Sequence, residues 1–407
     1  MATRIDLDID VLEAARQRIA WCFDTAPRLY LSFSGGKDST IMLHLAAEEA
    51  RQRGRRFGVL IVDLEAQYRL TIEHIQACLD DYADVIEPYW VCLPLALRNA
   101  VSQYEPKWEC WSPDKRDDWV RQPPPIGITD PAFFPFFERG MEFEDFVPAF
   151  GEWYAQGKMT LSLVGIRTDE SLNRWRTIMR DKVRLDGKPW TTWTGGTVWN
   201  AYPVYDWRTP DIWTYHARHG GRHNRLYDRM HQAGLSIHQM RICQPYGDDQ
   251  RKGLWLYHVI EPETWPRVVA RVNGANAGAL YAMQSGPING RIKVDKPLGH
   301  TWQSYTRFLL ESMPPASKEH FENKIAIFLR WWMDRGYQNG IPDEATTDEE
   351  ARKQKPTWRR IARCLLKNDY WCKGLSFGMT KASSYERYLK VMKNRRKKWQ
   401  IYGLDRF

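Results

Sequence analysis

A short segment near the N-terminus combines the residue types that bind an anion. Its six residues, which we call the loop segment, are Ser34, Gly35, Gly36, Lys37, Asp38 and Ser39. The two glycines let the backbone approach a ligand closely, because no Cβ stands in the way. The lysine adds a full positive charge, and the serines add hydroxyl donors. Residues of these types in this order are suited to holding a phosphate or sulfate group.

The elements on either side of the loop segment must aim it. Residues 29–33 predict a short buried strand, and an amphipathic helix follows the segment and ends at Gly54. A strand, a glycine turn and a helix start direct the first helical N–H groups and the helix dipole at negative charge. The segment is not a Walker A loop, because no glycine precedes Gly36 at the required spacing, and a G-x-G-x-x-G dinucleotide fingerprint is absent.

Alternating strands and helices continue after this point. Residues 57–63 and 85–93 predict further strands, and a helix is expected between them over 70–82. We therefore expect an α/β fold with a doubly wound, mostly parallel sheet. Asp63 stands at the carboxyl end of its strand, where open α/β sheets bind ligands. It is predicted either to contact a ribose or a metal ion, or to be an ordinary loop acid.

The loop segment resembles the PP-loop of the adenine nucleotide alpha hydrolase superfamily, which includes ATP pyrophosphatases, tRNA thiolation enzymes and PAPS reductases. Two later stretches resemble PAPS reductases in particular. Residues 165–171 are similar to their G-[IV]-R-x-x-E-S stretch. Residues 203–213 are similar to their P-[IV]-x-x-W-[ST]-x-x-D-[IV]-W signature, with Arg208 replacing the usual hydroxyl residue. Three matches in the same chain order make the resemblance specific.

These stretches supply the remaining candidate site residues. An arginine shortly after a strand and beside a glycine is placed to grip a phosphate or sulfate with two N–H groups, although it could also be a surface arginine. The resemblance adds Glu170 from the first of these stretches. It also adds His223 and Arg225, which fall where PAPS reductases carry a short H-P-L-Y stretch near the nucleotide. The candidates are Gly165, Arg167, Glu170, Arg174, His223 and Arg225.

The chain is predicted to hold two domains. We assign residues 1–240 to a PAPS reductase-like nucleotide-binding domain and residues 241–407 to a mostly helical, basic C-terminal domain. Residues from about 99 to 158 are rich in Pro, Trp and Phe and form an insertion, which could be a lid, a partner surface or simple aromatic packing. Residues 390–399 are strongly basic with one tryptophan, which suits a nucleic-acid backbone or a solvated helix face.

Composition limits the class of protein. The 407 residues carry a net charge of +9 with a pI of about 9.1, which favours an anionic partner such as a nucleotide or a nucleic acid. The sequence has no apolar run of membrane-spanning length and no signal peptide, and its seven cysteines are dispersed without a C-x-x-C pair. We therefore expect a cytoplasmic protein with no metal site built from its histidines or cysteines.

One feature departs from PAPS reductases. They attack the sulfonate with a cysteine in a C-terminal E-C-G-[IL]-H motif, and neither Cys243 nor Cys372 is followed by a histidine. From about residue 234 the chain instead resembles an IbrA-type branch of PAPS reductase-like proteins, described as prophage-gene co-activators with a C-terminal domain of unknown function. That resemblance implies a ParB-like protein partner.

The prediction is thus a PP-loop enzyme that binds ATP or PAPS. The first hypothesis is cleavage of ATP between its α- and β-phosphates with adenylylation of an acceptor, which could be DNA or RNA. Lys37 and Arg167 would be catalytic, and Mg²⁺ would assist. The alternatives are PAPS reduction, and a regulator that senses a nucleotide and binds DNA beside its ParB-like partner.

Overall fold

The chain is divided into two compact units in the computed structural model. The structure describes residues 8–102, 105, 107–179, 183–219, 221–247, 254–272, 275, 296–297, 299–311, 315–351, 355–366, 369 and 372–377. The first unit takes residues 1–95, 110–244 and 256–263, and the second takes residues 96–109, 245–255 and 264–407. The second unit therefore includes the start of the predicted insertion, residues 99–109.

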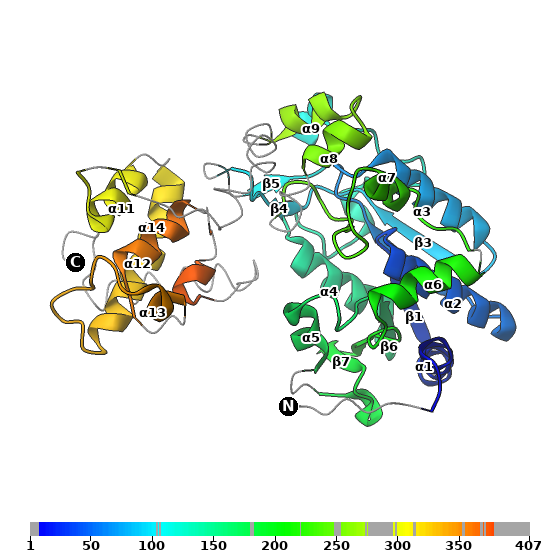
Figure 1. Ribbon diagram of the computed structural model, residues 1–407. Coiled ribbons are helices and arrows are strands. Elements are labelled where there is room, and N and C mark those ends of the chain that lie inside the picture. The colour runs from blue at the N-terminus through cyan, green and yellow to red at the C-terminus, as the bar shows by residue number, and fades with distance from the viewer. Residues whose placement is uncertain are drawn as a thin grey trace. The chain divides into compact units, whose positions relative to one another are not determined.

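A six-stranded sheet forms the centre of the first unit, with the strand order β3-β2-β1-β6-β8-β7 (Figure 1). The strands are β1 (Arg28–Ser32), β2 (Phe57–Val62), β3 (Ile86–Val91), β6 (Thr160–Val164), β7 (Thr191–Gly195) and β8 (Val198–Ala201). All neighbours pair in parallel except β7, which runs antiparallel to β8. The predicted α/β class with a mostly parallel sheet is confirmed.

Strand order locates the functional edge of this sheet. From β1 the chain builds outward to β2 and β3, and it then returns to place β6 on the other side of β1. The order of the strands reverses between β1 and β6, and ligands of open α/β sheets bind at the carboxyl ends of the strands at such a switch point. The loop segment follows β1, and residues 165–171 follow β6, so both stretches reach this point.

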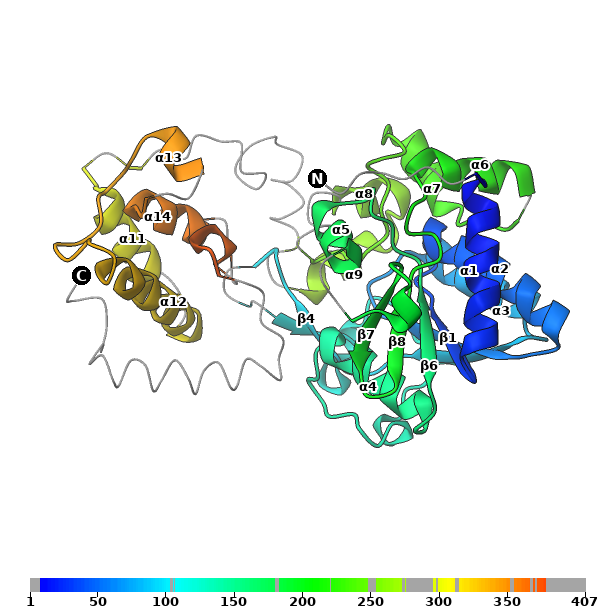
Figure 2. The same cartoon turned by 90° about the horizontal axis from the view of Figure 1, so that it is seen from below.

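Helices cover both faces of the sheet (Figures 1 and 2). The helices of this unit are α1 (Val11–Thr25), α2 (Lys37–Arg53), α3 (Arg69–Asp81), α4 (Phe143–Ala155), α5 (Leu172–Met179), α6 (Thr209–His219), α7 (Leu226–Gln232) and α8 (Trp255–Ile260). On the face covered by α4, the Tyr30 ring contacts Phe150 and Tyr154 with centroids 5.3 and 5.4 Å apart. The 3₁₀ turns are Pro113–Asp118, Pro131–Phe133 and Leu185–Gly187.

Much of the aromatic character of the insertion is explained by packing. Phe134, Phe146 and Phe150 are each at most 1 % exposed. Phe146 lies 5.5 Å from Phe134, measured between ring centroids, and Phe150 lies against Tyr30 of the central strand. For these residues the packing alternative is supported, because they build the layer that α4 lays on the sheet.

The second unit is mostly helical, with one small antiparallel sheet of β4 (Ala96–Arg98) and β5 (Lys107–Glu109). Its helices are α9 (Trp265–Arg271), α11 (Trp302–Glu311), α12 (Pro315–Met333), α13 (Thr347–Ala351) and α14 (Trp358–Leu366), with a 3₁₀ turn at Lys373–Leu375. A core of buried side chains that includes Trp302, Phe321, Ile325, Ile361 and Leu365 joins α11, α12 and α14.

One sequence-based expectation lies beyond the part of the chain that the structure describes. The basic stretch 390–399 lies outside the described residues. Among the described helices, none is long and apolar enough to cross a lipid bilayer.

Candidate nucleotide site at the switch point

The loop segment has the geometry that its glycines predict. Gly36 is the N-cap of α2, and Gly35 adopts a left-handed conformation with φ of +69°. A Cβ on Gly35 would lie 2.8 Å from Cγ1 of Ile75, closer than carbon atoms pack. Both the backbone angle and the close approach of α3 therefore require glycine at this position.

The two serines of the loop segment brace its backbone. The hydroxyl groups of Ser34 and Ser39 lie 3.0 Å apart, and the amide of Gly36 donates to the Ser34 hydroxyl at 3.3 Å. The Ser39 hydroxyl donates in turn to the carbonyl of Gly36 at 3.1 Å. These bonds fix the shape of the turn before any ligand arrives, which is the preorganisation that an anion site needs.

Lys37 is buried beneath segments from much later in the chain. Its ammonium lies 3.3 Å from a carboxylate oxygen of Asp38 and 3.5 Å from the carbonyl oxygen of Met240. The same ammonium lies 5.4 Å from the centroid of the Tyr227 ring, and the backbone amide of Lys37 donates to the Tyr227 hydroxyl at 3.0 Å. That hydroxyl places an oxygen atom at the N-terminus of α2, where an anion oxygen would bind.

Arg167 lies next to the loop segment, but its guanidinium is engaged by the protein. It forms an ion pair with Asp38, and it also donates to the carbonyl oxygen of Trp207 at 3.3 Å and to the hydroxyl of Thr209 at 3.5 Å. Its side chain is only 2 % exposed. Two cations, Lys37 and Arg167, therefore share one buried carboxylate. The pair with Asp38 uses Nε of Arg167, whereas Nη1 and Nη2 face Trp207 and Thr209.

Gly165 brings the end of β6 against the start of α2. A Cβ at this position would lie 3.0 Å from the backbone nitrogen of Ser39. Because this neighbour is backbone rather than a flexible side chain, the space is available only to glycine. Gly165 thus acts through packing, and it holds the Arg167 stretch beside the loop segment.

The other resemblance-based candidates are partly or fully exposed, and Glu170 is the most enclosed of them, with a side chain that is 21 % exposed. Arg174 has a 52 % exposed side chain and lies 3.6 Å from the carboxylate of Glu170. His223 lies 3.2 Å from the carboxylate of Asp228, and Arg225 is exposed at the start of α7. These four charged groups are not brought into contact with the loop segment by any bond in the described structure.

Two residues of the same stretch that the sequence analysis did not select contact the loop segment directly. Asn224 is fully buried, and its amide group donates to the carbonyl of Gly35 at 2.9 Å and to the hydroxyl of Thr71 at 3.1 Å. Tyr227 follows one helical turn later and meets Lys37. Their signal was present, since polar residues three apart at a helix start lie on one face.

Asp63 is a structural acid in this conformation. It is fully buried, accepts hydrogen bonds from the Trp90 indole at 2.8 Å and the Glu65 amide at 3.0 Å, and forms an ion pair with Arg121. Glu65 in turn accepts from the amide of Trp111 at 2.7 Å. The two carboxylates tie the insertion to the end of β2, which supports the ordinary-acid alternative for Asp63.

A group of histidines packs behind the loop segment. His216 lies 3.2 Å from the Lys37 carbonyl through Nε2, and His74 lies 2.9 Å from the hydroxyl of Thr40. Burial lowers the pKa of His74 to about 3 and that of His44 to about 4, and it also lowers the pKa of His216. These rings are therefore neutral at pH 7. Within the described residues, no group of three or more His, Cys, Asp or Glu side chains could hold a metal ion.

Polar atoms without a partner lie beside this cluster. Trp213 Nε1, His216 Nδ1 and His44 Nε2 are buried and have no hydrogen-bond partner in the part of the chain that the structure describes. The Trp213 ring lies 5.4 Å from the ring of Tyr227, which contacts Lys37. Because buried polar groups are normally satisfied, such atoms next to an anion-binding turn are places where a ligand would supply the missing bonds.

Two protein-family models match parts of the chain. Residues 28–121 match the Phosphoadenosine phosphosulfate reductase domain, and residues 234–352 and 337–386 match a Domain of unknown function (DUF3440).

Solved structures with a related fold include PAPS reductase from Candida auris and NMN synthetase from Francisella tularensis. The first is 10 % identical with a TM-score of 0.28 and covers 56 % of this chain and 94 % of its own. The second is 13 % identical with a TM-score of 0.31 and covers 72 % and 100 %. Likenesses this weak support no inference about this chain.

A full-length relative gives the family. The uncharacterized protein YbdN of Escherichia coli (strain K12) is 49 % identical over 402 residues, which is 98 % of both chains. The chain therefore belongs to the YbdN family, whose first part here is a PAPS reductase-like PP-loop domain.

Proposed function

We propose that the first unit binds an adenine nucleotide through the loop segment and acts at its phosphates. The observation that carries this proposal is the Tyr227 hydroxyl on the Lys37 amide, 3.0 Å away. That oxygen lies at a helix N-terminus, beside a lysine, on a turn that two glycines shape. Tyr227 is thus a lid residue whose hydroxyl occupies the position that a phosphate oxygen takes when the nucleotide enters.

The favoured reaction is adenylyl transfer from ATP. A nucleophile on the acceptor attacks the α-phosphorus, the bond between that phosphorus and the oxygen that bridges to the β-phosphate breaks, and pyrophosphate leaves with the bonding electrons. The proton of the acceptor passes to solvent. Lys37 and the loop amides stabilise the charge that develops on the departing oxygen. Arg167 is a positioning residue here, because it holds Asp38 next to Lys37. A nucleic acid acceptor would fit the net charge of +9.

The carboxylates near the loop segment would not act as ligands of Mg²⁺. The carboxylate nearest to Lys37, that of Asp38, is ion-paired with two cations, and Asp63 is saturated by protein contacts. These residues do not fit a resident metal ion, so Mg²⁺ would enter with the triphosphate that it already coordinates.

A product analysis tests the proposal. Full-length protein is incubated with ATP and Mg²⁺, with and without DNA or tRNA, and AMP and pyrophosphate are quantified. Lys37→Ala is expected to abolish product. Lys158→Ala is the matched control. This exposed lysine precedes β6, so it lies at the amino ends of the parallel strands, opposite to the loop segment at their carboxyl ends. Product that persists in Lys37→Ala would exclude the loop segment as the reaction site.

A specific cysteine favours PAPS reduction as the second candidate. All seven cysteines are described, six are buried, and only Cys243 is partly exposed. Cys243 comes three residues after Met240, whose carbonyl oxygen lies 3.5 Å from the Lys37 ammonium, so this cysteine lies near the site. Its thiolate would attack the sulfonate sulfur of PAPS and release PAP. An added thiol would then attack the resulting S-sulfocysteine, forming a mixed disulfide and releasing sulfite.

The cysteines allow a clean test of this candidate. With PAPS and a thiol reductant, Cys243→Ser should lose sulfite release, whereas Cys92→Ser, which changes a buried thiol, should retain it. Absence of sulfite from the wild-type protein excludes the candidate. If both nucleotides bind and neither is converted, the third candidate function remains. That function, which the IbrA-type resemblance implies, is a nucleotide-sensing regulator with a ParB-like partner.

A further inference from the structure

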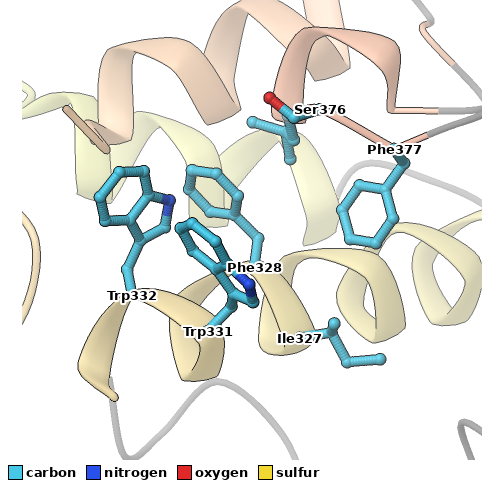
Figure 3. Close-up of a pocket in the computed structure, with 7 residues that line it drawn as sticks. Ile327, Phe328, Trp331, Trp332, Ser376 and Phe377 are labelled. Carbon is cyan, nitrogen blue, oxygen red and sulfur yellow. The ribbon is translucent and has the colours of Figure 1, made fainter. Parts of the chain in front are cut away.

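The second unit carries an apolar groove to which the proposed nucleotide site assigns no role. It lies between α12 and the segment after α14, has a volume of about 310 Å³, and is lined in part by Ile327, Phe328, Trp331, Trp332, Ser376 and Phe377 (Figure 3). Its walls are mainly aromatic. Phe328 and the two tryptophans lie on α12, and Phe377 lies in the segment after α14.

Trp331 is the most accessible ring in this groove. Its side chain is 47 % exposed, although it lies on a helix whose neighbouring residue Phe328 is only 4 % exposed. Trp332 fixes its orientation, with the two ring centroids 4.8 Å apart and the planes at 81°. A large indole held in one orientation and left half in solvent is a flat surface on which another ring can stack.

Positive charge accompanies the aromatic rings. The guanidinium of Arg335 lies 3.6 Å from the centroid of Trp331 and donates to the Trp331 carbonyl at 3.1 Å. Lys324, whose ammonium lies 4.7 Å from the centroid of Phe377, is by contrast buried, at 1 % exposed, so the surface charge of the groove comes from Arg335. A guanidinium that is stacked on an indole keeps its full charge while its position is fixed.

The positive charge of the sequence is concentrated in its last part. Residues 264–407 contain 27 lysines and arginines against 13 acidic residues, whereas residues 1–263 contain 32 against 37. The positive excess of the protein therefore belongs to the part that carries the groove. A groove with the Arg335 guanidinium on its most exposed ring, in a part of the sequence with excess positive charge, complements a polyanion with flat apolar groups better than it complements an apolar peptide.

We propose that this groove binds single-stranded nucleic acid, with a base stacked on the Trp331 ring and the backbone phosphates beside Arg335. Single strands expose the flat faces of their bases, and aromatic side chains in a basic groove bind them without sequence preference. In a duplex those faces are covered by neighbouring base pairs. The proposal does not depend on chemistry at the loop segment, because it concerns binding alone.

Fluorescence anisotropy with a labelled oligothymidylate tests the groove in the full-length protein. Trp331→Ala should weaken binding about tenfold, because stacking of one base on an aromatic ring contributes about 1–3 kcal/mol. Trp331→Phe keeps an aromatic face and should stay within about threefold of wild type. The matched control is Trp193→Ala, which removes a 50 % exposed tryptophan from β7 of the first unit and should change nothing.

A second variant keeps the test decisive if the loss of Trp331 perturbs folding. Ser376→Asp puts a negative charge at the groove from an exposed position without removing an aromatic ring. Aspartate tolerates the left-handed backbone of this residue, with φ of +74°, and the variant should also weaken binding. Equal affinity of wild type, Trp331→Ala and Ser376→Asp for the single strand would overturn the proposal. Preference for the duplex, or competition by an apolar peptide but not by unlabelled oligothymidylate, would overturn it as well.

Discussion

The two candidate sites, one in each unit, hold their cations in opposite ways. In the first, Lys37 and Arg167 are buried and share the carboxylate of Asp38. In the second, Arg335 lies on the half-exposed ring of Trp331. A buried network fixes positions, because each charge depends on its partners. A stacked cation at the surface keeps its charge available to a partner of variable shape. The comparison suggests positioned chemistry in the first unit and adaptable binding in the second.

Among the predicted variants, the one that removes a buried charge should lower the free energy of unfolding most. Arg167→Ala deprives Asp38 of one of its two cations, and loss of one partner from a buried pair destabilises a protein by about 3–5 kcal/mol. Urea titration of the two proteins measures the difference. Arg174→Ala is the control, because its side chain is 52 % exposed and such pairs contribute at most about 1 kcal/mol. Equal losses in both variants would show that the network is not stabilising.

Substitution in the turn should have the next largest effect. Gly35→Ala combines a positive φ with a contact of 2.8 Å to Ile75, so we expect a loss of about 2–4 kcal/mol and weak nucleotide binding. Gly54→Ala separates the two causes, because φ there is +61° but a Cβ would meet nothing within 4 Å. The control should lose only about 1 kcal/mol. Similar stability of the two variants would mean that α3 shifts to accommodate the added Cβ at little cost in free energy.

The buried histidines should make the first unit sensitive to acid. The pKa of His44 is about 4 in the fold, below its ordinary value of 6.5, so the unfolded chain binds more protons as the pH falls. The stabilisation is complete above pH 6.5 and decreases between about 6.5 and 4, by about 1.4 kcal/mol per pH unit for one histidine. Urea titrations at about pH 7 and pH 5 should give a smaller decrease for His44→Gln than for wild type. An unchanged decrease would mean that His44 does not titrate in this range.

The smallest predicted change concerns the lid residue. Tyr227→Phe removes one neutral hydrogen bond, worth about 1 kcal/mol, and frees the Lys37 amide. Inorganic phosphate should then bind more tightly, by up to about tenfold. Tyr202→Phe removes a comparable bond, 2.8 Å to Thr192, and should leave phosphate binding unchanged. Weaker phosphate binding in Tyr227→Phe would mean that the hydroxyl contacts the ligand and does not compete with it.

Local patterns were sufficient to predict part of the sheet and the glycine turn. Apolar runs located β1, β2 and β3 to within about two residues. β7 and β8 were not predicted, because exposed and half-buried residues such as Trp193 and Trp199 interrupt the apolar pattern there. Glycine at position 35 was predicted for a close approach of the backbone, whereas its left-handed conformation is known only from the structure.

The site contacts depend on residues that are distant in the sequence, and these could not be derived. Lys37 meets Tyr227, 190 positions away, and Arg167 turns toward Asp38, 129 positions away. A lone arginine after a strand predicts a free anion grip, whereas its true partner is known only once the strands β1 and β6 are adjacent. Likewise the saturation of Asp63 depends on Arg121 in the insertion.

Equilibrium binding of ATP is the most direct test of the central claim that the loop segment holds the nucleotide phosphates. Isothermal titration of the full-length protein should detect binding to wild type and to Lys158→Ala, and a loss of at least about tenfold in Lys37→Ala, because a charge-assisted contact to phosphate contributes about 1.5–3 kcal/mol. The same affinity in all three proteins would contradict the account and place the nucleotide elsewhere on the molecule.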